Sequence, residues 1–514
     1  MLLPTRPPVA PPGGAATGAA AVTLTSCGGN GANMPAADGS TLASTWIDAA
    51  GDGQLQVGPG EPLADRTKLG GSQRLTRELA RLVHVTDAHV MDASSPARVP
   101  FLARLGPPLQ STFRPQEALT AQVLHGAINA TRAQHPELVI QGGDLVDNDQ
   151  NNELVHGLAL LNGGHVHPGS GPDGYYGVQL PSDPDPFYYR PDIDAPRHPG
   201  MLRHAVRAFT SRGAGGDWVP VLGDHDALVQ GELVPSSTTQ SLAVGDRALW
   251  NMPTDLRLPA GMKLNATGSP DGPPSSSFVE SFVQQALAGP TVQVPPDHHR
   301  YELAFAEVIG RLWNASRAAA QPLLSGASSA SASQRLDYVR DVGAALRLIV
   351  LDVVRRGGGS GGLIQTDQPA WLEQQIAGAG ERWVIVVTHQ PIEDSSGGEA
   401  IFELLDRSPR VIAALAGHTH RNRILPRATG AGGYWLITTC SLIDFPQQCR
   451  ALRLYATANG GVAIRTWMLD HVGNGPLGPV SRELSYLDAQ GERAGHFSGT
   501  RWDRNATLFR RGVG

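Results

Sequence analysis

The chain has 514 residues, 41% of them hydrophobic, which is enough for one large core with insertions or for two domains. Its 41 Lys and Arg residues against 47 Asp and Glu residues give a formal net charge of -6. No run of basic residues suits a phosphate backbone, so nucleic acid is not an expected partner. No stretch of about 18 or more uninterrupted apolar residues predicts a membrane-spanning helix.

Residues 1–73 are interpreted as a low-complexity leader and tether. The first 60 are rich in Gly, Ala, Pro, Ser and Thr, a composition typical of a disordered or processed segment. Within them, the run Leu24 to Gly28 resembles the lipobox of bacterial lipoproteins, in which Cys27 would carry the lipid. Arg6 is the only basic residue before this run, which does not suit a signal peptide. We expect export to the cell envelope of a bacterium, with a lipid on Cys27 as the only membrane attachment. The alternative is a cytoplasmic protein with a low-complexity tail.

Five short Asp/His motifs each follow an apolar, strand-like run. The runs cover residues 82–86, 138–141, 218–222, 383–387 and 411–416. The motifs after them are Asp87-Ala88-His89, Gly143-Asp144, Gly223-Asp224-His225-Asp226, Thr388-His389 and Gly417-His418-Thr419-His420. Because α/β sheets place ligands at the carboxyl ends of buried strands, we expect these motifs to converge. Carboxylates and neutral imidazoles suit two cations about 3.5–4 Å apart, which can clamp both oxygens of a displacement at phosphorus. The series therefore predicts a two-metal hydrolytic centre.

Spacing within the motifs supports this prediction. His418 and His420 alternate on an extended segment, so both side chains face one side, and Asp87 and His89 have the same spacing. Asp144 follows two glycines, which allow the backbone to turn tightly so that the carboxylate faces inward.

The main domain is predicted to cover residues 74–480. Two long insertions, at about 149–215 and 227–335, interrupt the strand pattern. The first is rich in Pro, Gly, Asp and Tyr and predicts little regular structure, whereas the second is expected to be partly helical. Loops this long are usually functional or disordered, so we expect the insertions to cap the site, with surface decoration as the alternative. Residues 481–514 are interpreted as a C-terminal tail.

The ordered motifs D-x-H, G-D-x-x-D, G-x-H-D, H and G-H-x-H resemble the signature of calcineurin-like metallophosphoesterases, over about residues 80–470. The resemblance implies an α/β (α+β) fold, a four-layer αββα sandwich of two mixed sheets. It implies that one metal is held by Asp87, His89, Asp144 and His420. It implies that the other metal is held by Asp144, Asp224, His389 and His418. Two divalent ions, of Mn, Fe or Zn, are the expected cofactors.

The same resemblance assigns a role to His225, and the residues near the motifs suggest further roles. His225 would be the unligated imidazole beside the phosphoryl group, stabilising charge or protonating the leaving oxygen. Asp226 is predicted to hold His225 in a useful tautomer. Asp147 and Asn148 are candidates to contact substrate or to orient ligands, with a loop cap as an equally good account. Arg450 is a candidate phosphate contact, although a structural salt bridge is the favoured interpretation.

The predicted function is a metal-dependent phosphoric ester hydrolase, with metal-bound hydroxide attacking a small phosphomonoester or phosphodiester. A catalytically weak binding or regulatory protein that retains the scaffold is the alternative. A nuclease is disfavoured by the acidic balance.

Two positions depart from the family's pattern. Asp224 stands where the family has Asn; with Asp87, Asp144 and a bridging hydroxide it would bring the charge of the ligands to -4, cancelling two divalent cations. The exchange either alters metal and substrate preference or is a tolerated substitution. Asp147 stands where purple acid phosphatases have a Tyr ligand, which argues against a ferric-tyrosinate site.

The sequence contains two further cysteines, Cys440 and Cys449. They are either bonded across a loop or two free buried thiols, because spacing alone does not fix the distance between their Cα atoms.

Overall fold

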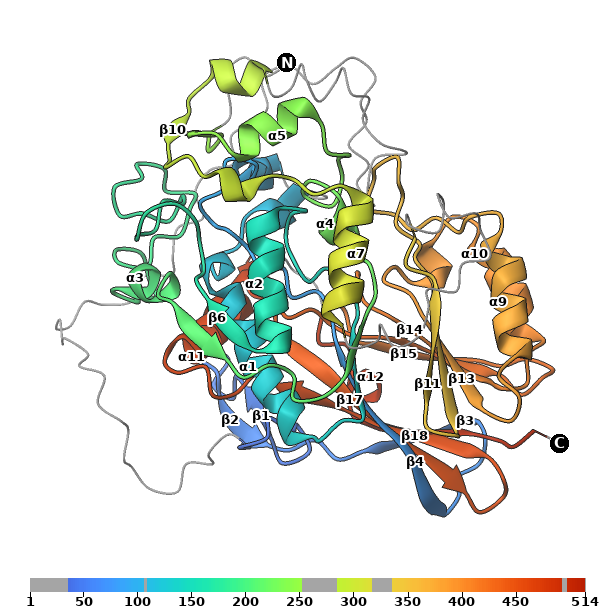
Figure 1. The fold of residues 1–514 in the computed structure, drawn as a ribbon. Coiled ribbons are helices and arrows are strands. Elements are labelled where there is room, and N and C mark those ends of the chain that lie inside the picture. Colours follow the sequence, from blue (N-terminus) through green and yellow to red (C-terminus); the bar gives the residue numbers. More distant parts are fainter. Residues whose placement is uncertain (1–35, 106–108, 252–283, 317–334, 492–496, 514) are drawn as a thin grey trace.

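Two mixed β-sheets form the centre of the molecule (Figure 1). The computed structural model describes residues 36–105, 109–251, 284–316, 335–491 and 497–513. Each sheet contains both parallel and antiparallel pairs, and helices surround both sheets. The predicted mixed α/β class is confirmed.

The larger sheet has seven strands and draws on both ends of the chain. Its spatial order is β3 (Ala64–Leu69), β19 (Ala506–Arg510), β18 (Val462–Asp470), β17 (Gln448–Thr457), β4 (Leu75–Val85), β5 (Leu138–Gln141) and β8 (Trp218–Pro220). Strands β4, β5 and β8 are parallel, so their carboxyl ends lie at one edge of the sheet.

The smaller sheet has six strands. Its spatial order is β11 (Tyr338–Val342), β12 (Leu346–Val350), β13 (Trp383–Val387), β14 (Val411–Ala416), β16 (Tyr434–Thr438) and β15 (Arg423–Arg427). Its four middle strands are parallel, and the two edge strands are antiparallel to their neighbours.

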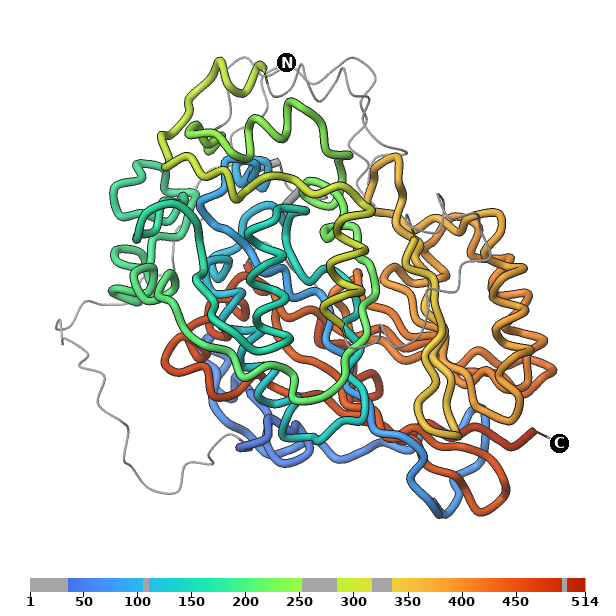
Figure 2. The backbone as a smooth tube through the Cα atoms, in the orientation of Figure 1, coloured from blue at the N-terminus to red at the C-terminus, as the bar shows by residue number. Residues whose placement is uncertain are grey.

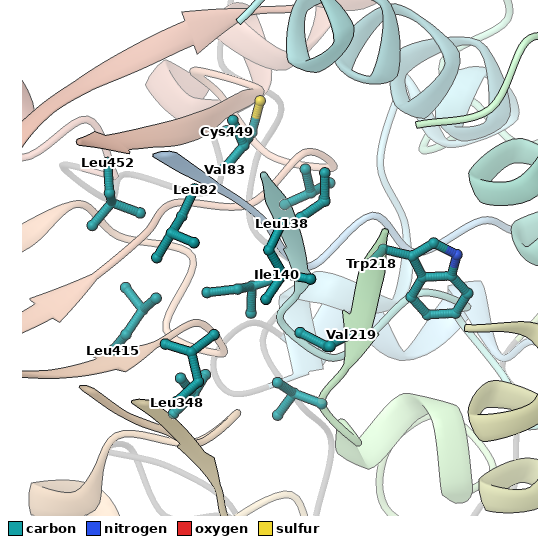
Figure 3. Packing of buried hydrophobic residues seen from close by; sticks show 14 of the residues in the cluster. Leu82, Val83, Leu138, Ile140, Trp218, Val219, Leu348, Leu415, Cys449 and Leu452 are labelled. Atoms are coloured by element: carbon teal, nitrogen blue, oxygen red, sulfur yellow. The ribbon is translucent and has the colours of Figure 1, made fainter. Parts of the chain in front are cut away.

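The two sheets share one hydrophobic core. Figure 3 shows Leu82 of β4, Ile140 of β5 and Leu452 of β17 gathered with Leu348 of β12 and Leu415 of β14. All five side chains are at most 2% exposed. This shared core brings the parallel strands of both sheets together.

The smaller sheet is buried on both of its faces. Leu348 belongs to the core shared with the larger sheet, whereas Ile349, the next residue, packs in a second cluster. That cluster contains Leu372 of α9 (Gln368–Ala377) and Ile401 of α10 (Gly398–Asp406). Near-continuous apolar sequence in β12 to β14 follows from this burial on two sides.

On the other side of the molecule, α1 (Thr120–Ala133) contacts β17 and β18, and α2 (Asn151–Asn162) contacts α1 (Figure 1). The other helices in the part of the chain that the structure describes are α3 (Met201–Ala205), α4 (Asp224–Ala227), α5 (Ser237–Ala243), α7 (Phe305–Ala315), α11 (Leu477–Gly491) and α12 (Arg501–Arg504). Short 3-10 turns are η1 (Pro100–Leu105), η2 (Leu109–Thr112), η3 (Glu117–Leu119), η4 (His298–Arg300) and η6 (Ile392–Asp394). Among the described residues, three two-stranded pairs are β1 (Ser44–Ile47) with β2 (Gln56–Pro59), β6 (Gly164–Val166) with β7 (Phe209–Ser211), and β9 (Arg247–Ala248) with β10 (Val292–Gln293).

Both chain ends contribute strands beyond the predicted 74–480 range. Strand β3 pairs with β19, and β19 pairs with β18 at the edge of the larger sheet. Figure 2 shows the blue N-terminal and red C-terminal segments side by side there. Strand β3 has the sequence ADRTKL, with only its two ends buried, so its place depends on backbone pairing that apolar periodicity does not reveal. Cys27 and the rest of the lipobox lie outside the described residues.

The first insertion is more regular than expected. Within 149–215 the structure has α2, β6, α3 and β7, and Leu154, Leu160 and Leu161 of α2 are buried in the shared core. The second insertion contains the expected helix α7, while residues 252–283 and 317–334 lie outside the described ranges. In the described ranges, every helix is too short or too polar to cross a bilayer.

Candidate metal centre

The five Asp/His motifs meet where the parallel strands of the two sheets end. Asp87 and Asp144 follow β4 and β5, and Asp224 opens α4 after β8. His389 follows β13, and His418 and His420 follow β14 in the other sheet. All seven predicted ligands therefore come together at one place, as the strand-end pattern predicted.

The backbone adopts an uncommon conformation at most of these positions. Asp87, His89, Asp144, His418 and His420 have φ values of 52°, 44°, 50°, 64° and 56°. Left-handed backbone at residues other than glycine costs roughly 1–3 kcal/mol each and concentrates at functional sites. The left-handed conformation turns the five side chains toward one another, and the surrounding structure must offset its cost.

Glycines beside the ligands are required by close approach. A Cβ at Gly143 would lie 2.3 Å from Nδ1 of His389, and one at Gly223 would lie 2.1 Å from Oδ1 of Asp144. Both distances are shorter than a methyl group tolerates. The motifs therefore need glycine so that ligand side chains from other strands can pack against their backbone.

The first ligand set consists of Asp87, His89, Asp144 and His420, whose ligand atoms all lie within 4.8 Å of one another. Nε2 of His420 is 3.4 Å from Oδ1 of Asp87, and Nε2 of His89 is 3.6 Å from Oδ2 of Asp144. The two Nε2 atoms are only 3.3 Å apart. This set matches the group of residues assigned to one metal by the sequence.

The second ligand set consists of Asp144, Asp224, His389 and His418, again with all ligand atoms within 4.8 Å. Nε2 of His389 lies 3.1 Å from Oδ2 of Asp144 and 3.2 Å from Oδ1 of Asp224. Nδ1 of His418 is 3.2 Å from the same Asp224 oxygen. Asp144 belongs to both sets, as a bridging carboxylate would.

The hydrogen bonds of three imidazoles show that these sets fit cations. His389 directs Nδ1 to the carbonyl oxygen of Gly142 at 2.9 Å, and His89 directs Nδ1 to Asp147 at 3.1 Å. His420 likewise directs Nδ1 to Asp444. Nδ1 must carry the proton to donate to these oxygens, so the neutral ring presents a bare lone pair at Nε2. In each set these lone pairs point at carboxylate oxygens, an arrangement that a cation between them satisfies.

The charges of the centre are closely coupled. Burial would lower the pKa of His389, but Asp144, Asp224 and Asp87 outweigh it and raise that pKa well above its ordinary value. Conversely, although burial opposes it, His418 and His389 hold the pKa of Asp224 well below its ordinary range. The concentrated negative charge thus favours positive charge at the centre.

His225 belongs to neither four-residue ligand set, although one of its ring nitrogens lies within 4.8 Å of ligand atoms of His89 and Asp147. Its Nδ1 is 2.7 Å from the carbonyl oxygen of Asp147, and its ring stacks edge-on against His89 with centroids 4.5 Å apart. The side chain is 23% exposed, so a substrate can reach it. Burial would lower the pKa of His225, but Asp144, Asp224 and Asp147 raise it to about 9.

Asp226 does not hold His225 as the sequence predicted. Its carboxylate accepts backbone N–H groups of Gly223 at 2.9 Å, Leu145 at 2.8 Å and Val146 at 3.3 Å. Asp226 therefore ties the two motif loops together, and the group that accepts from Nδ1 of His225 is the Asp147 carbonyl. Burial, with Asp144 nearby, raises the pKa of Asp226 to about 7.

The two candidate substrate contacts also have structural partners. Asn148 is fully buried, and its Oδ1 accepts the N–H of Gln230 at 2.8 Å. Arg450 is fully buried too, and its guanidinium donates to Asn422 at 2.8 Å and to the carbonyl of Asp503 at 2.9 Å, among other protein groups. The interpretation of Arg450 as a phosphate contact is thus not supported, because its donors face the interior. The alternative of a structural role for Arg450 fits, although the named oxygens that accept its hydrogen bonds are neutral and do not form the expected salt bridge.

The sequence analysis did not single out Asp444, in the segment 441–448, as a functional residue. Asp444 is 2% exposed and contacts both His420 and Arg114. The available signal was an acidic residue directly after the apolar pair Leu442-Ile443, downstream of the last motif. Cys440 and Cys449, on either side of this segment, are both buried and free, so the thiol alternative is correct.

Comparisons with known proteins give likeness of structure alone. No family model and no curated protein matches the sequence. The chain is similar to a dimetal phosphatase from Danio rerio at 11% identity, covering 77% of this chain and 100% of that one, with a TM-score of 0.37. It is similar to PhoD at 11% identity, covering 82% and 74%, with a TM-score of 0.30. It is also similar to the sulfate thiohydrolase SoxB of Thermus thermophilus at 12% identity, covering 82% and 62%, with a TM-score of 0.28. At such scores these likenesses carry no argument, and the functional conclusion rests on the geometry of the two ligand sets.

Proposed function

We propose that this chain is a metal-dependent phosphoric ester hydrolase of the calcineurin-like metallophosphoesterase type, with a dinuclear centre. The observation that carries the proposal is the pair of four-residue ligand sets that share Asp144. The four-layer αββα arrangement belongs to the same proposal, since helices lie outside two sheets with a common core.

The proposed roles follow from the positions of the side chains. Two divalent cations, of Mn, Fe or Zn, would offset the charge of the phosphoryl group and make a water molecule nucleophilic near neutral pH. Asp144 fixes the spacing of the two ligand sets because its carboxylate belongs to both. His225, outside both sets and partly exposed, would stabilise developing charge or donate a proton to the leaving oxygen.

Asp224 makes the two ligand sets alike in composition. Each contains two carboxylates and two imidazoles, whereas an Asn at 224 would leave the second set with one carboxylate. The additional charge reduces the net positive charge of the loaded site. We therefore propose that a monoanionic diester suits the site better than a dianionic monoester.

Hydrolysis of two aryl phosphate esters tests the proposal. The wild-type protein, loaded with Mn²⁺ or Zn²⁺, is expected to hydrolyse p-nitrophenyl phosphate or bis(p-nitrophenyl) phosphate. The Asp144→Asn variant should lose at least about 100-fold of the rate, since removing groups that merely orient ligands already costs 10–100-fold. Full metal occupancy without hydrolysis of a broad ester panel would instead favour the binding or regulatory protein that retains the scaffold.

The cellular location of the protein is also a proposal. We propose an exported protein of a bacterial cell envelope acting on a small phosphoester, with attachment only through a lipid on Cys27. Sizing the amino terminus of the mature protein by mass spectrometry tests this, because cleavage before Cys27 is expected and an intact Met1 would contradict it.

A further inference from the structure

The two ligand sets contain the same kinds of residue but differ in what lies behind them. The first set is Asp87, His89, Asp144 and His420, and the second is Asp144, Asp224, His389 and His418. With two carboxylates and two imidazoles in each, residue type gives no reason for unequal metal binding. Any inequality must come from the groups that hold the imidazoles.

Both imidazoles of the first ligand set are backed by carboxylates. Nδ1 of His89 lies 3.1 Å from Oδ1 of Asp147, and Nδ1 of His420 contacts Oδ2 of Asp444. Asp147 and Asp444 are 3% and 2% exposed, so water weakens these contacts little. A carboxylate behind an imidazole fixes the ring's orientation and makes its other nitrogen a stronger donor to a metal.

Asp444 is itself held firmly. Nε of Arg114 donates to its Oδ1 at 2.8 Å, and Nη2 donates to its Oδ2 at 3.3 Å. The backbone N–H of Asp444 also donates to Ser441 at 3.0 Å. Arg114 is 4% exposed, and its own backbone N–H donates to Glu117 at 3.2 Å. The guanidinium places a positive charge against Asp444 and directs one of its oxygens at His420.

The second ligand set has no such backing in the described part of the chain. Nδ1 of His389 contacts a neutral group, the carbonyl oxygen of Gly142, at 2.9 Å. His418 turns Nδ1 toward Asp224, and its Nε2 has no hydrogen-bond partner among the described residues. The side chain of His418 is also 24% exposed, so solvent competes there.

We propose that Asp444, held by Arg114, is a positioning residue for His420 and makes the first ligand set the tighter of the two metal sites. The inference deepens the proposed function and rests on it. The chain would retain one cation while the other exchanges. The same inference explains why the segment 441–448, which follows the last ligand, places a charged residue in the buried interior.

Competition for Zn²⁺ with a chromophoric chelator tests the proposal on the full chain. Wild-type protein should release two Zn²⁺ ions with dissociation constants that differ by at least about tenfold. Asp444→Asn should weaken the tighter constant by about 10–100-fold and leave the weaker one unchanged. Asp224→Asn should weaken the weaker constant and leave the tighter one unchanged, because Asp224 belongs to the second ligand set alone.

The chain offers a matched control and a second variant. Asp406 receives the same two-nitrogen fork, from Arg427 at 2.6 Å and 2.6 Å, but contacts no ligand imidazole. Asp406→Asn should therefore leave both constants unchanged. Should Asp444→Asn fail to fold, Arg114→Gln decides the question, since it releases Asp444 and should weaken the same constant to a lesser extent.

The outcomes separate this inference from the proposed function. Two Zn²⁺ ions of equal affinity, or a folded Asp444→Asn protein with an unchanged tight constant, would overturn the role of Asp444 and leave the hydrolase intact. A shift of both constants together would show a merely structural effect and also overturn it. Wild-type protein that binds no Zn²⁺ would overturn the dinuclear centre itself.

Discussion

At the residue scale, the tautomers of the histidines determine what the centre can bind. Nδ1 of His89, His389 and His420 is used by Asp147, Gly142 and Asp444, which leaves Nε2 of each ring free to ligate. Each Nε2 then lies 3.1–3.6 Å from a carboxylate oxygen of its own ligand set. Two acceptors do not approach one another without a positive charge between them, which either a proton on Nε2 or a bound cation supplies.

His225 is expected to act on substrate and not on metal. His225→Ala should keep the wild-type metal content, because His225 lies outside both ligand sets, but lower kcat by about 100 to 10 000-fold. Elemental analysis and steady-state kinetics on the same preparation check both parts. His204→Ala, at an exposed position on α3, is the control and should change neither. Loss of metal in His225→Ala would place His225 among the ligands and contradict the assignment.

The ligands could be predicted from the sequence, whereas the groups that support them could not. Asp87 and His89, and likewise His418 and His420, converge because of their strand-end position. Their backbone is left-handed, with φ values of 44–64°, so the extended alternation predicted from their spacing is wrong. Asp226 had the right residue type for a partner of His225, but its carboxylate turns to backbone N–H groups of the neighbouring loop. Such a choice between two nearby partners depends on side-chain direction, which spacing in the sequence does not contain.

At the element scale, the strands were predictable where they are buried on both faces. Strands β5, β13 and β14 match the predicted runs 138–141, 383–387 and 411–416 residue for residue. Strands β3 and β19 lie at one side of the larger sheet, and β3 in particular lacks apolar residues in its interior. Backbone pairing between distant parts of the chain places them, and a local pattern cannot report it.

Strand β19 is expected to be essential for the fold. It pairs with β18 and β3, and Arg510 at its end also donates to the carbonyl groups of Ala431 at 2.9 Å and Gly433 at 3.3 Å, beside the smaller sheet. A chain that ends at Asn505 loses all of these contacts. It should show no cooperative thermal unfolding by circular dichroism, whereas a control chain ending at Arg511 should unfold like wild type. Equal midpoints for the two chains would show that β19 is dispensable.

At the scale of the whole molecule, the insertions are joined to each other beside the metal centre. Gln150 pairs with Glu302 in an isolated bridge, and the N–H of Leu303 donates to the carbonyl of Asp149 at 2.9 Å. These contacts connect the start of the first insertion to the second. The sequence predicted two insertions, but not that they pair, because residues 149–151 and 301–303 are far apart and carry no complementary pattern.

This junction buries two carboxyl groups and should make stability depend on pH. Burial raises the pKa of Glu302 to about 7, from an ordinary value of 4.5, and burial together with Glu302 raises the pKa of Asp149 well above its usual range. A carboxyl group whose pKa is raised by folding stabilises the folded state only while it is protonated. This group therefore lowers the free energy of unfolding as the pH rises from about 4.5 through about 7.

Glu302→Gln should relieve this penalty. The amide keeps an acceptor for the hydroxyl of Thr239, which donates to Glu302 at 2.8 Å, but it cannot ionise. Near pH 8 the variant should be more stable than wild type by up to about 3 kcal/mol, and near pH 4 the two should be similar. Urea unfolding at both pH values measures this, with the more exposed Glu307→Gln on α7 as the control. A variant that is less stable near pH 8 would show that the ionised carboxylate has a partner there, such as a cation.

The central claim of a dinuclear hydrolase is tested most directly by titrating metal-stripped protein with Zn²⁺ or Mn²⁺ while hydrolysis of bis(p-nitrophenyl) phosphate is measured. Because Asp144 joins the two ligand sets into one centre, activity should appear mainly with the second metal equivalent and saturate at two per chain. Two bound equivalents with no hydrolysis of this or other phosphoesters, or saturation of activity at one equivalent, would contradict the account.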